Sequence, residues 1–189
     1  MVDLFKYVKV YKKSFNKEFC KDIIILLNNS KIKKRHMFYT VDNKSLFMGK
    51  DPLGINLEDN QNKYNEYIMN TLRKIIYNYI SNLKMKWFRG WSGYSFPKFL
   101  KYSKNESMKL HCDHINGLFI NNNETNGVPI LTLITLLNES FLGGELFLIN
   151  KKIKLTVGDT IVFPSNFLYP HKINKINKGK RYSMSSWVW

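Results

Sequence analysis

Hydrophobic residues in the first half of the chain recur at helical spacing in two segments. Glu18 to Asn28 places its apolar residues on one face and ends in a polar run that stops a helix. Asn65 to Leu83 repeats the spacing of three and four residues over a longer stretch. Both segments are predicted to be amphipathic helices that bury one face and serve as scaffold, with some extended chain beside them.

The pattern changes after residue 87, where short runs rich in aromatic and β-branched residues are separated by glycine, asparagine and proline. Such runs are typical of strands joined by turns. Lys152 to Val157 alternates strictly, Gly158-Asp159 follows as a turn, and Thr160 to Phe163 ends at Pro164. We therefore expect a β-hairpin here, and a polar loop at Asn121 to Asn126.

Helices followed by many short antiparallel strands predict a mainly β protein with N-terminal helices. The expected architecture is a double-stranded β-helix, a jelly roll of cupin type, with two or more helices packed on the outside of one sheet. The 189 residues are the size of one domain, and neither a linker nor an internal repeat is visible. We expect a single domain over residues 1–189, with mostly helical support in 1–86 and the jelly-roll core and active site in 87–189.

A net charge of +16 indicates an acidic partner, and nucleic acid or the ribosome is one candidate. The chain has no alanine and is rich in lysine, asparagine and isoleucine, which is also what AT-rich codons would produce. Basic residues are scattered, with no dense block beyond Lys31 to Arg35. A dedicated nucleic-acid surface is therefore the less favoured of the two explanations.

The two cysteines, Cys20 and Cys112, are too few for a disulfide scaffold and lack the paired spacing of a zinc site. The first residues alternate charged and apolar side chains, unlike an export signal. No apolar stretch reaches the ~20 residues that a membrane helix needs. We expect a soluble cytoplasmic protein, in the host cytoplasm if it is viral, that is a monomer or homodimer and has no membrane partner.

His111-Cys112-Asp113 is the first candidate for a metal site. In a strand, residues two apart project from the same face, so one imidazole and one carboxylate can converge while Cys112 faces away. The same alternation turns His114 away from Asp113. Alone, such a tripeptide is more typical of a surface turn or a hydrogen-bonded pair.

A third ligand is available at His171, which follows the strand-ending Tyr169-Pro170. Two imidazoles and one carboxylate leave three positions open on an octahedral iron(II), so that dioxygen and a bidentate co-substrate can bind together. A structural zinc site would instead have four protein ligands. The set of His111, Asp113 and His171 therefore favours an iron(II) oxygenase.

Arg181 begins a predicted strand that continues to Trp187. The strand period of two puts Arg181, Ser183 and Trp187 on one face. A guanidinium is permanently charged and can bind a carboxylate through two hydrogen bonds, which suits the distal end of a dicarboxylate. Ser183 is a candidate for a further donor to the same carboxylate.

Several linked motifs run in order through roughly the last ninety residues: Tyr102 to Asp113, Leu131 to Asn138, Gly143-Gly144-Glu145-Leu146, Gly158-Asp159, Phe163-Pro164-Ser165, His171 and Gly179 to Ser183. With these motifs the chain resembles the prolyl 4-hydroxylase-like branch of the 2-oxoglutarate and iron(II)-dependent dioxygenases. The N-terminal half carries no such resemblance.

The resemblance implies Fe(II) as the metal, 2-oxoglutarate and dioxygen as co-substrates, and ascorbate as a candidate reductant. It assigns His111, Asp113 and His171 to the iron. It assigns Arg181 to the C5 carboxylate of 2-oxoglutarate, with the hydroxyl of Tyr102 beside it.

Further positions follow from the same resemblance. Thr135 is a weaker candidate near the C5 carboxylate. Trp187 matches an aromatic residue on the substrate side of the iron, with core packing as an equal alternative. Met108 stands where relatives often have a tyrosine that faces the substrate, which leaves the substrate open. Gly143 and Gly144 are expected to serve a tight strand entry and not the chemistry.

The implied activity is hydroxylation, with 2-oxoglutarate converted to succinate and carbon dioxide. Prolyl residues of a protein or peptide are the first candidate substrate. The nucleic-acid demethylase branch carries a second arginine six residues after the first, where this chain has Trp187. The same chemistry on nucleic acid, a ribosomal protein or a small molecule stays open, as does a non-catalytic, cupin-like binding module.

Overall fold

The computed structural model describes residues 3–30, 33–35, 38–39, 45–46, 52–55, 64–88, 90–114, 120–121, 124–125 and 127–189. Its helical elements are a 3-10 helix η1 and the α-helices α1 and α2: Leu4–Tyr7, Lys17–Asn29 and Asn65–Leu83. The strands β1 to β9 are Lys9–Tyr11, Lys33–Arg35, Phe38–Tyr39, Ser45–Leu46, Leu53–Ile55, Lys98–Tyr102, Met108–His111, Ile120–Asn121 and Glu124–Thr125. The strands β10 to β17 are Leu131–Leu136, Phe141–Gly143, Leu146–Leu148, Lys151–Ile153, Thr160–Pro164, His171–Ile173, Ile176–Gly179 and Arg181–Val188.

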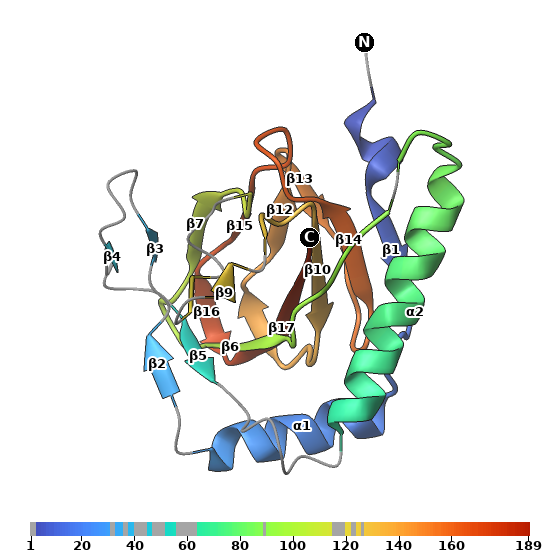
Figure 1. Cartoon of the computed structure of the whole chain (residues 1–189). Coiled ribbons are helices and arrows are strands. Elements are labelled where there is room, and N and C mark those ends of the chain that lie inside the picture. Colours follow the sequence, from blue (N-terminus) through green and yellow to red (C-terminus); the bar gives the residue numbers. More distant parts are fainter. Residues whose placement is uncertain are drawn as a thin grey trace.

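Two antiparallel sheets form the body of the protein (Figure 1). The seven-stranded sheet has the order β1-β14-β10-β17-β6-β5-β2, and the four-stranded sheet has the order β13-β12-β15-β7. Three short pairs, β11-β16, β3-β4 and β8-β9, complete the described strands. The predicted double-stranded β-helix is confirmed, with neighbouring strands drawn from distant parts of the chain.

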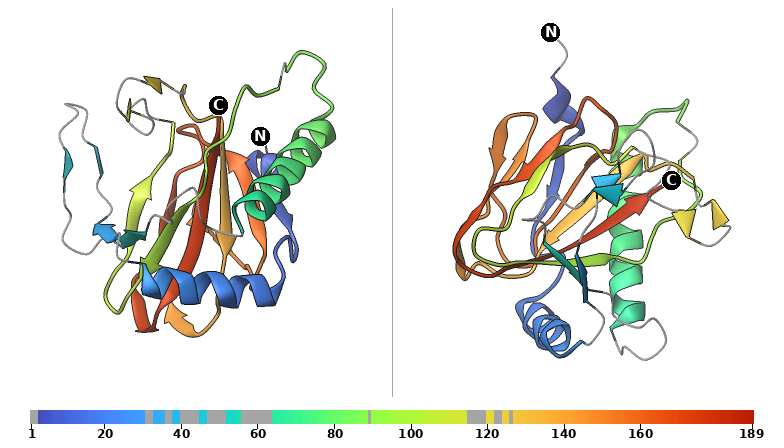
Figure 2. Two further views of the ribbon diagram at one scale, coloured as in Figure 1. Left: turned by 60° about the horizontal axis from the view of Figure 1, so that its bottom comes forward. Right: turned by 90° about the vertical axis from the view of Figure 1, so that its left-hand side faces the viewer.

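Both predicted α-helices are confirmed, and they lie outside the seven-stranded sheet (Figure 1, Figure 2). Asn16 caps α1, because its side chain accepts a hydrogen bond from the backbone N–H of Phe19 at 2.7 Å. The apolar faces of the helices join one core with the outward face of the sheet, which includes Leu133 and Met184. The helices therefore cover one side of the sheet and leave its other side to the four-stranded sheet.

A second core fills the space between the two sheets. The larger sheet contributes Leu100, Ile134 and Phe163, and the smaller sheet contributes Leu148 and Ile173. Because neighbouring residues of a strand point to opposite faces, this inner core and the helix-covered core use alternate positions of the same strands. Each residue of the larger sheet can therefore be assigned to the helix side or the inner side from its register.

The expected hairpin between Lys152 and Pro164 is wrong. β13 pairs with β12 in the smaller sheet, whereas β14 pairs with β10 and β1 in the larger one. Ile149 and Asn150 both have positive φ, 47° and 64°, which is the geometry of a tight hairpin turn and closes β12 onto β13. Gly158, also at positive φ, then packs so closely on the backbone oxygen of Phe15 that a Cβ would collide with it.

The N-terminal half contributes more than helices to the sheet. β1 pairs with β14 at one edge, and β5 and β2 extend the sheet beyond β6 at the other. The sheet therefore does not begin at residue 87, although residues 87–189 supply its central strands. The expected polar loop at Asn121 to Asn126 contains the last residue of β8 and the whole of the two-residue strand β9, while 122–123 and 126 lie outside the described residues.

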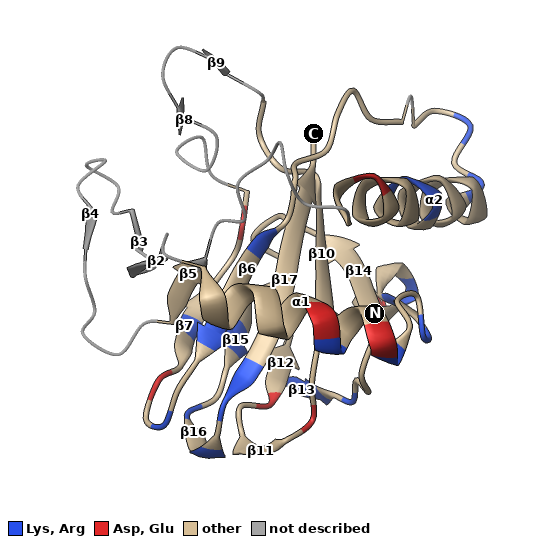
Figure 3. Cartoon of the chain, turned by 90° about the horizontal axis from the view of Figure 1, so that it is seen from below, with Lys and Arg blue, Asp and Glu red and all other residues tan. Residues whose placement is uncertain are grey.

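Basic residues occur on helices, strands and turns alike in the view of Figure 3. This agrees with the scattered pattern along the sequence. The side chains of the block Lys31 to Arg35 lie outside the described residues. Within the part of the chain that the structure describes, no helix has the length and apolar character needed to cross a bilayer.

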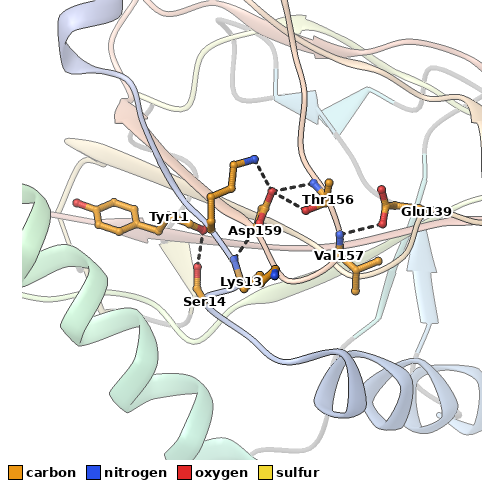
Figure 4. A network of polar contacts seen from close by, with 8 residues as sticks. Tyr11, Lys13, Ser14, Glu139, Thr156, Val157 and Asp159 are labelled. Carbon is orange, nitrogen blue, oxygen red and sulfur yellow. Dashed lines mark hydrogen bonds and ion pairs between the residues drawn. The ribbon is translucent and has the colours of Figure 1, made fainter.

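Asp159 ties the N-terminal segment to the turn before β14 (Figure 4). Its buried carboxylate accepts hydrogen bonds from the backbone N–H of Lys13 at 2.9 Å and of Thr156 at 2.8 Å, and it pairs with Lys12 at 2.8 Å. Burial alone would raise the pKa of Asp159, but Lys12 and the N–H donors outweigh burial and lower it. Folding therefore favours the ionised form.

Replacing Asp159 by asparagine is expected to lower the free energy of unfolding by about 2–3 kcal/mol, because buried donors lose a charged acceptor. The folded-state pKa lies below that of the unfolded chain, so this stabilisation is present above about pH 4 and is lost as the pH falls further. Urea denaturation across this pH range should show a steeper loss in the native protein than in Asp159→Asn. As a control, Lys12→Met should cost less than about 1 kcal/mol, since the lysine side chain is 60% exposed.

Candidate metal centre

Three potential metal ligands meet at the inner face between the sheets. His111 ends β7, His171 begins β15, and the two residues are paired across these neighbouring strands. Nε2 of His111 lies 3.4 Å from Oδ1 of Asp113, and Nε2 of His171 lies 3.6 Å from Oδ2. One ligand atom from each residue can be chosen so that all lie within 4.8 Å of one another, which is close enough to share one metal ion.

Asp113 reaches this point by a bend and not by strand alternation. β7 ends at His111, so the expectation of a strand through Asp113 is wrong, although the two side chains do converge. The backbone N–H groups of Asp113 and His114 both donate to the carbonyl oxygen of Ser165, at 3.2 and 3.0 Å. These bonds fasten the segment after β7 to the end of β14. His114 is exposed and its Nδ1 lies 2.7 Å from the carbonyl oxygen of Pro129, away from the cluster.

The imidazole rings are oriented by backbone carbonyls. Nδ1 of His111 lies 2.7 Å from the carbonyl oxygen of Lys109, and Nδ1 of His171 lies 3.4 Å from that of Tyr169. A proton on each Nδ1 leaves Nε2 as the lone-pair nitrogen, and both Nε2 atoms face Asp113. Both imidazoles can therefore offer the Nε2 lone pair to one metal ion.

A β-bulge in β7 places Met108 and His111 on the same inner side. Met108 pairs with Ile173 and His111 pairs with His171, so two residues of β7 stand opposite the single residue Lys172. Met108 is consequently buried in the inner core, and the two bulge residues are exposed. The structure puts Met108 beside the candidate site but beneath its surface.

The carboxylate of Asp113 is held by two donors from the larger sheet. Thr132 donates through Oγ1 to Oδ2 at 2.8 Å, and the indole N–H of Trp187 donates to the same oxygen at 2.9 Å. Ser165 lies 2.8 Å from Oγ1 of Thr132 and extends the network. Sequence reasoning missed Thr132 and Ser165. The signal for Thr132 is its strand pairing, because it lies directly opposite Trp187 in the register of β10 and β17.

The protonation states of the cluster suit a divalent metal. Burial raises the pKa of Asp113, but the two imidazoles and the Trp187 indole together lower it by more than burial raises it. The net pKa is therefore well below its usual range. Burial lowers the pKa of His171 to about 4. Burial also lowers the pKa of His111, but the hydrogen bond to Asp113, the charge of Asp113 and hydrogen bonds with the backbone together outweigh burial and give a net rise, so a metal would displace a proton there. Two neutral imidazoles and one carboxylate form a donor set that fits Fe(II) and leaves coordination positions open.

Arg181 is a buried cation on the same inner face. It is 2% exposed, stands opposite Tyr102 in the register of β17 and β6, and its guanidinium carbon lies 5.2 Å from the centre of the Tyr102 ring. Nη1 donates to Oγ of Ser183 at 2.8 Å. Among the described residues, no carboxylate forms an ion pair with this guanidinium. Burial lowers the pKa of Arg181, and an acidic ligand would relieve that cost.

Gly144 leaves room for the arginine. Its φ is +66°, a Cβ would collide with the side chain of Ile176, and the same Cβ would come within 3.2 Å of Cδ of Arg181. This agrees with the structural role expected for the Gly143-Gly144 pair.

The structure contradicts the expectation that Thr135 lies near the C5 carboxylate site. Thr135 pairs with Met184 on β17, and both belong to the helix-covered side of the sheet. Its hydroxyl is 2.7 Å from that of Thr160 on β14. The residues of β10 on the inner side are its neighbours, Ile134 and Leu136, because they pair with Ser185 and Ser183.

Lys98 is a second inner-face cation that the sequence did not reveal. It pairs with Ser185 in the register of β6 and β17, so it shares the face of Arg181 and Trp187. Burial lowers the pKa of Lys98, and the charge of Asp113 partly offsets this. The positive charge on this face therefore has two sources along β6 and β17.

Thr132 and Thr135 provide a matched test of the two faces of β10. Thr132→Val removes a donor to Asp113 at almost constant volume, so it should weaken iron binding by about tenfold. Thr135→Val should leave iron affinity unchanged and lower the free energy of unfolding by about 1 kcal/mol through the lost contact with Thr160. Anaerobic iron titration and urea denaturation measure these effects. Equal iron affinity in the two variants would contradict the assignment of Thr132 to the metal site.

In a comparison with known protein families, residues 97–189 match the family model of the 2OG-Fe(II) oxygenase superfamily. A search of curated protein sequences finds no match. Solved structures of similar fold include a viral collagen prolyl hydroxylase from Paramecium Bursaria Chlorella virus-1 in its 2OG complex, with 14% identity, a TM-score of 0.63, and coverage of 96% of this chain and 94% of that one.

Two further structures are similar over the same extent. A Pseudomonas putida prolyl-4-hydroxylase has 13% identity and a TM-score of 0.64, with 96% of this chain and 91% of that one covered. A prolyl hydroxylase from Trichoplax adhaerens, in complex with a peptide fragment of the hypoxia inducible factor, has 16% identity and a TM-score of 0.70, with 96% and 83% covered. At these identities the likeness is one of fold.

Proposed function

We propose, from the membership of residues 97–189 in the 2OG-Fe(II) oxygenase superfamily, that this dioxygenase hydroxylates prolyl residues of a protein or peptide. Family membership makes Fe(II), 2-oxoglutarate and dioxygen the cofactor and co-substrates of the reaction. Bound together, they supply the oxidising power for hydroxylating a C–H bond while 2-oxoglutarate is converted to succinate and carbon dioxide.

The observation that carries the proposal is the shared inner face of the cluster and the buried arginine. Asp113 is held by Trp187 near one end of β17, and Arg181 lies at the other end of the same strand. Alternate residues of β17 between them face the same side. A dicarboxylate with one end at Arg181 would extend toward the cluster along this face.

In this proposal each residue of the chain has a distinct task. His111, Asp113 and His171 hold the iron, and the Lys109 and Tyr169 carbonyls keep the imidazoles oriented. Arg181 binds the distal carboxylate, and Ser183 and Tyr102 fix the position of the guanidinium. Thr132 and Trp187 keep the Asp113 carboxylate oriented toward the imidazoles.

The remaining parts of the chain have supporting tasks. Met108 and the ring of Trp187 border the substrate side. The helices and strands of residues 1–86 would support the sheet as part of one domain, and none of the described residues among them belongs to the cluster. Ascorbate would serve as a reductant that keeps iron in the ferrous state.

The substrate class is supported by three of the proteins of similar fold, which are prolyl hydroxylases, one of them in complex with a peptide. Nucleic acid and ribosomal protein are the competing substrates, and the net charge of +16 is the observation that favours them. A non-catalytic binding module is the competing class of function.

Mass spectrometry separates these alternatives. The iron-loaded protein, with 2-oxoglutarate and ascorbate, is incubated with proline-containing peptides and with matched peptides in which alanine replaces proline. The proposal expects a gain of one oxygen, located on proline and absent from the alanine series. Oxygen found on other residues or on nucleic acid would redirect the substrate assignment, and the absence of both oxygen transfer and succinate would favour the binding module.

A further inference from the structure

An open groove of about 450 Å³ lies along β7 and β15 of the smaller sheet. Its walls are the residues Ser107–Leu110, on and beside β7, and the residues Lys172–Lys175, on and after β15. The β7 bulge forms this groove, because both residues of the bulge, Lys109 and Leu110, are exposed. We call this feature the bulge groove.

The bulge groove combines positive charge with apolar surface. Lys109, Lys172 and Lys175 supply the charge, and no carboxylate of the described residues forms an ion pair with any of them. Leu110 is 58% exposed and gives the groove an apolar wall. Lys172 also lies over the ring of Phe147, at 5.3 Å from its centre.

The acidic groups near the groove are already engaged. Glu145 is paired with Lys152 at 3.3 Å and accepts a hydrogen bond from Asn174. Glu106 is buried and accepts a hydrogen bond from the backbone N–H of Ser103 at 2.7 Å. The charge offered to a ligand in the groove is therefore positive.

The shape favours an extended polypeptide over a nucleic acid. Four residues of a strand span about 13 Å, so the wall formed by β7 matches about four residues of an extended peptide. Such a peptide points alternate side chains to the same side, so acidic and apolar residues can meet the lysines and Leu110 separately. Single-stranded nucleic acid is bound mainly by stacking on aromatic side chains, and the groove walls contain none.

The groove residues are also close along the chain to two of the candidate metal ligands. Its walls belong to the two strands that carry His111 and His171. The carbonyl oxygen of Lys109, a groove residue, is the group that orients the His111 ring at 2.7 Å. A ligand in the groove would therefore contact the backbone that holds one candidate iron ligand.

From these features we infer that the bulge groove binds an acidic, extended segment of a polypeptide partner, with Lys109, Lys172 and Lys175 facing its carboxylates and Leu110 its apolar side chains. The inference rests on the proposed function only in treating that polypeptide as the substrate.

The test measures binding by fluorescence anisotropy and needs no turnover. The full-length, iron-loaded chain is titrated with a fluorescein-labelled octapeptide in which glutamate and leucine alternate. The double variant Lys172→Glu/Lys175→Glu should weaken this binding by about tenfold, because it replaces two attractions by two repulsions. Lys172→Met/Lys175→Met only removes the charge. It should weaken binding by about half as much, when the change in affinity is expressed as a logarithm.

A charge-matched control lies on the opposite side of the molecule. Lys17 and Lys21 are exposed on α1, so Lys17→Glu/Lys21→Glu changes the net charge equally and should weaken binding by less than twofold. Equal losses in the two glutamate variants would overturn the inference, since net charge alone would then explain binding. It would also be overturned if an oligothymidylate of equal charge bound more tightly than the peptide and lost as much affinity in Lys172→Glu/Lys175→Glu. Failure of oxygen transfer with retained, groove-dependent binding would count against the proposed function and leave the groove intact.

Discussion

Replacing Asp113 by alanine is expected to lower the affinity for Fe(II) by more than about a hundredfold and to abolish succinate formation. Loss of a hydrogen bond to a metal ligand typically costs ten- to a hundredfold, so loss of the ligand itself should cost more. Asp113 is the only carboxylate of the described three-residue cluster, and both imidazoles face it. Anaerobic titration with Fe(II), read as bound metal per chain, measures the loss.

The neighbours of Asp113 serve as controls in the same segment. Cys112→Ala and His114→Ala should bind iron as tightly as the unaltered chain, because neither residue belongs to the cluster. Circular dichroism of all three variants checks that the fold is retained. A loss of iron in His114→Ala comparable to that in Asp113→Ala would contradict the ligand assignment.

Replacing Arg181 by methionine is expected to raise the KM for 2-oxoglutarate by more than about a hundredfold, corresponding to about 3 kcal/mol for a broken buried ion pair. Methionine keeps much of the volume, so the inner core should stay packed. Without 2-oxoglutarate the variant should be at least as stable as the native chain, because a fully buried charge that has no carboxylate partner among the described residues is removed.

Thermal unfolding separates this role from a purely structural one. Addition of 2-oxoglutarate should raise the Tm of the native chain through binding to the folded state, and Arg181→Met should lose this rise while keeping its iron. Arg181→Lys keeps the charge but not the paired donors, so its KM should fall between the two. An unchanged response to 2-oxoglutarate in Arg181→Met would show that the dicarboxylate binds elsewhere.

The helices and the last strand were predictable from sequence because their signals are local. The apolar spacing of Asn65–Leu83 gives the bounds of α2, and the alternation after Arg181 gives β17. The grouping of His111, Asp113 and His171 also follows from motifs, since their order along the chain resembles a known family. What the family resemblance added was the pairing of distant residues that local patterns cannot supply.

The errors share a physical cause, which is that strand partners are chosen by tertiary packing. The strict alternation of Lys152 to Val157 predicted a strand, yet the turn at Ile149 and Asn150 paired its first part with β12 instead of β14. Thr135 was expected near the C5 carboxylate, but it pairs with Met184 and so lies on the other face from Arg181, since one residue along a strand changes the face.

Other features have no sequence signature at all. The bulge at Lys109 and Leu110 exists only as a mismatch between β7 and β15, and the bond from Thr132 to Asp113 depends on the bend after His111. Both require the assembled sheets.

Succinate formation from 2-oxoglutarate tests the central claim most directly. The purified chain is freed of metal, reloaded with Fe(II), and supplied with 2-oxoglutarate, dioxygen and ascorbate, with and without the peptide mixture. The account predicts succinate that depends on iron and dioxygen, increases with a proline-containing peptide, and is absent from Asp113→Ala. No succinate from the iron-loaded native chain under any of these conditions, or equal succinate from Asp113→Ala, would contradict it.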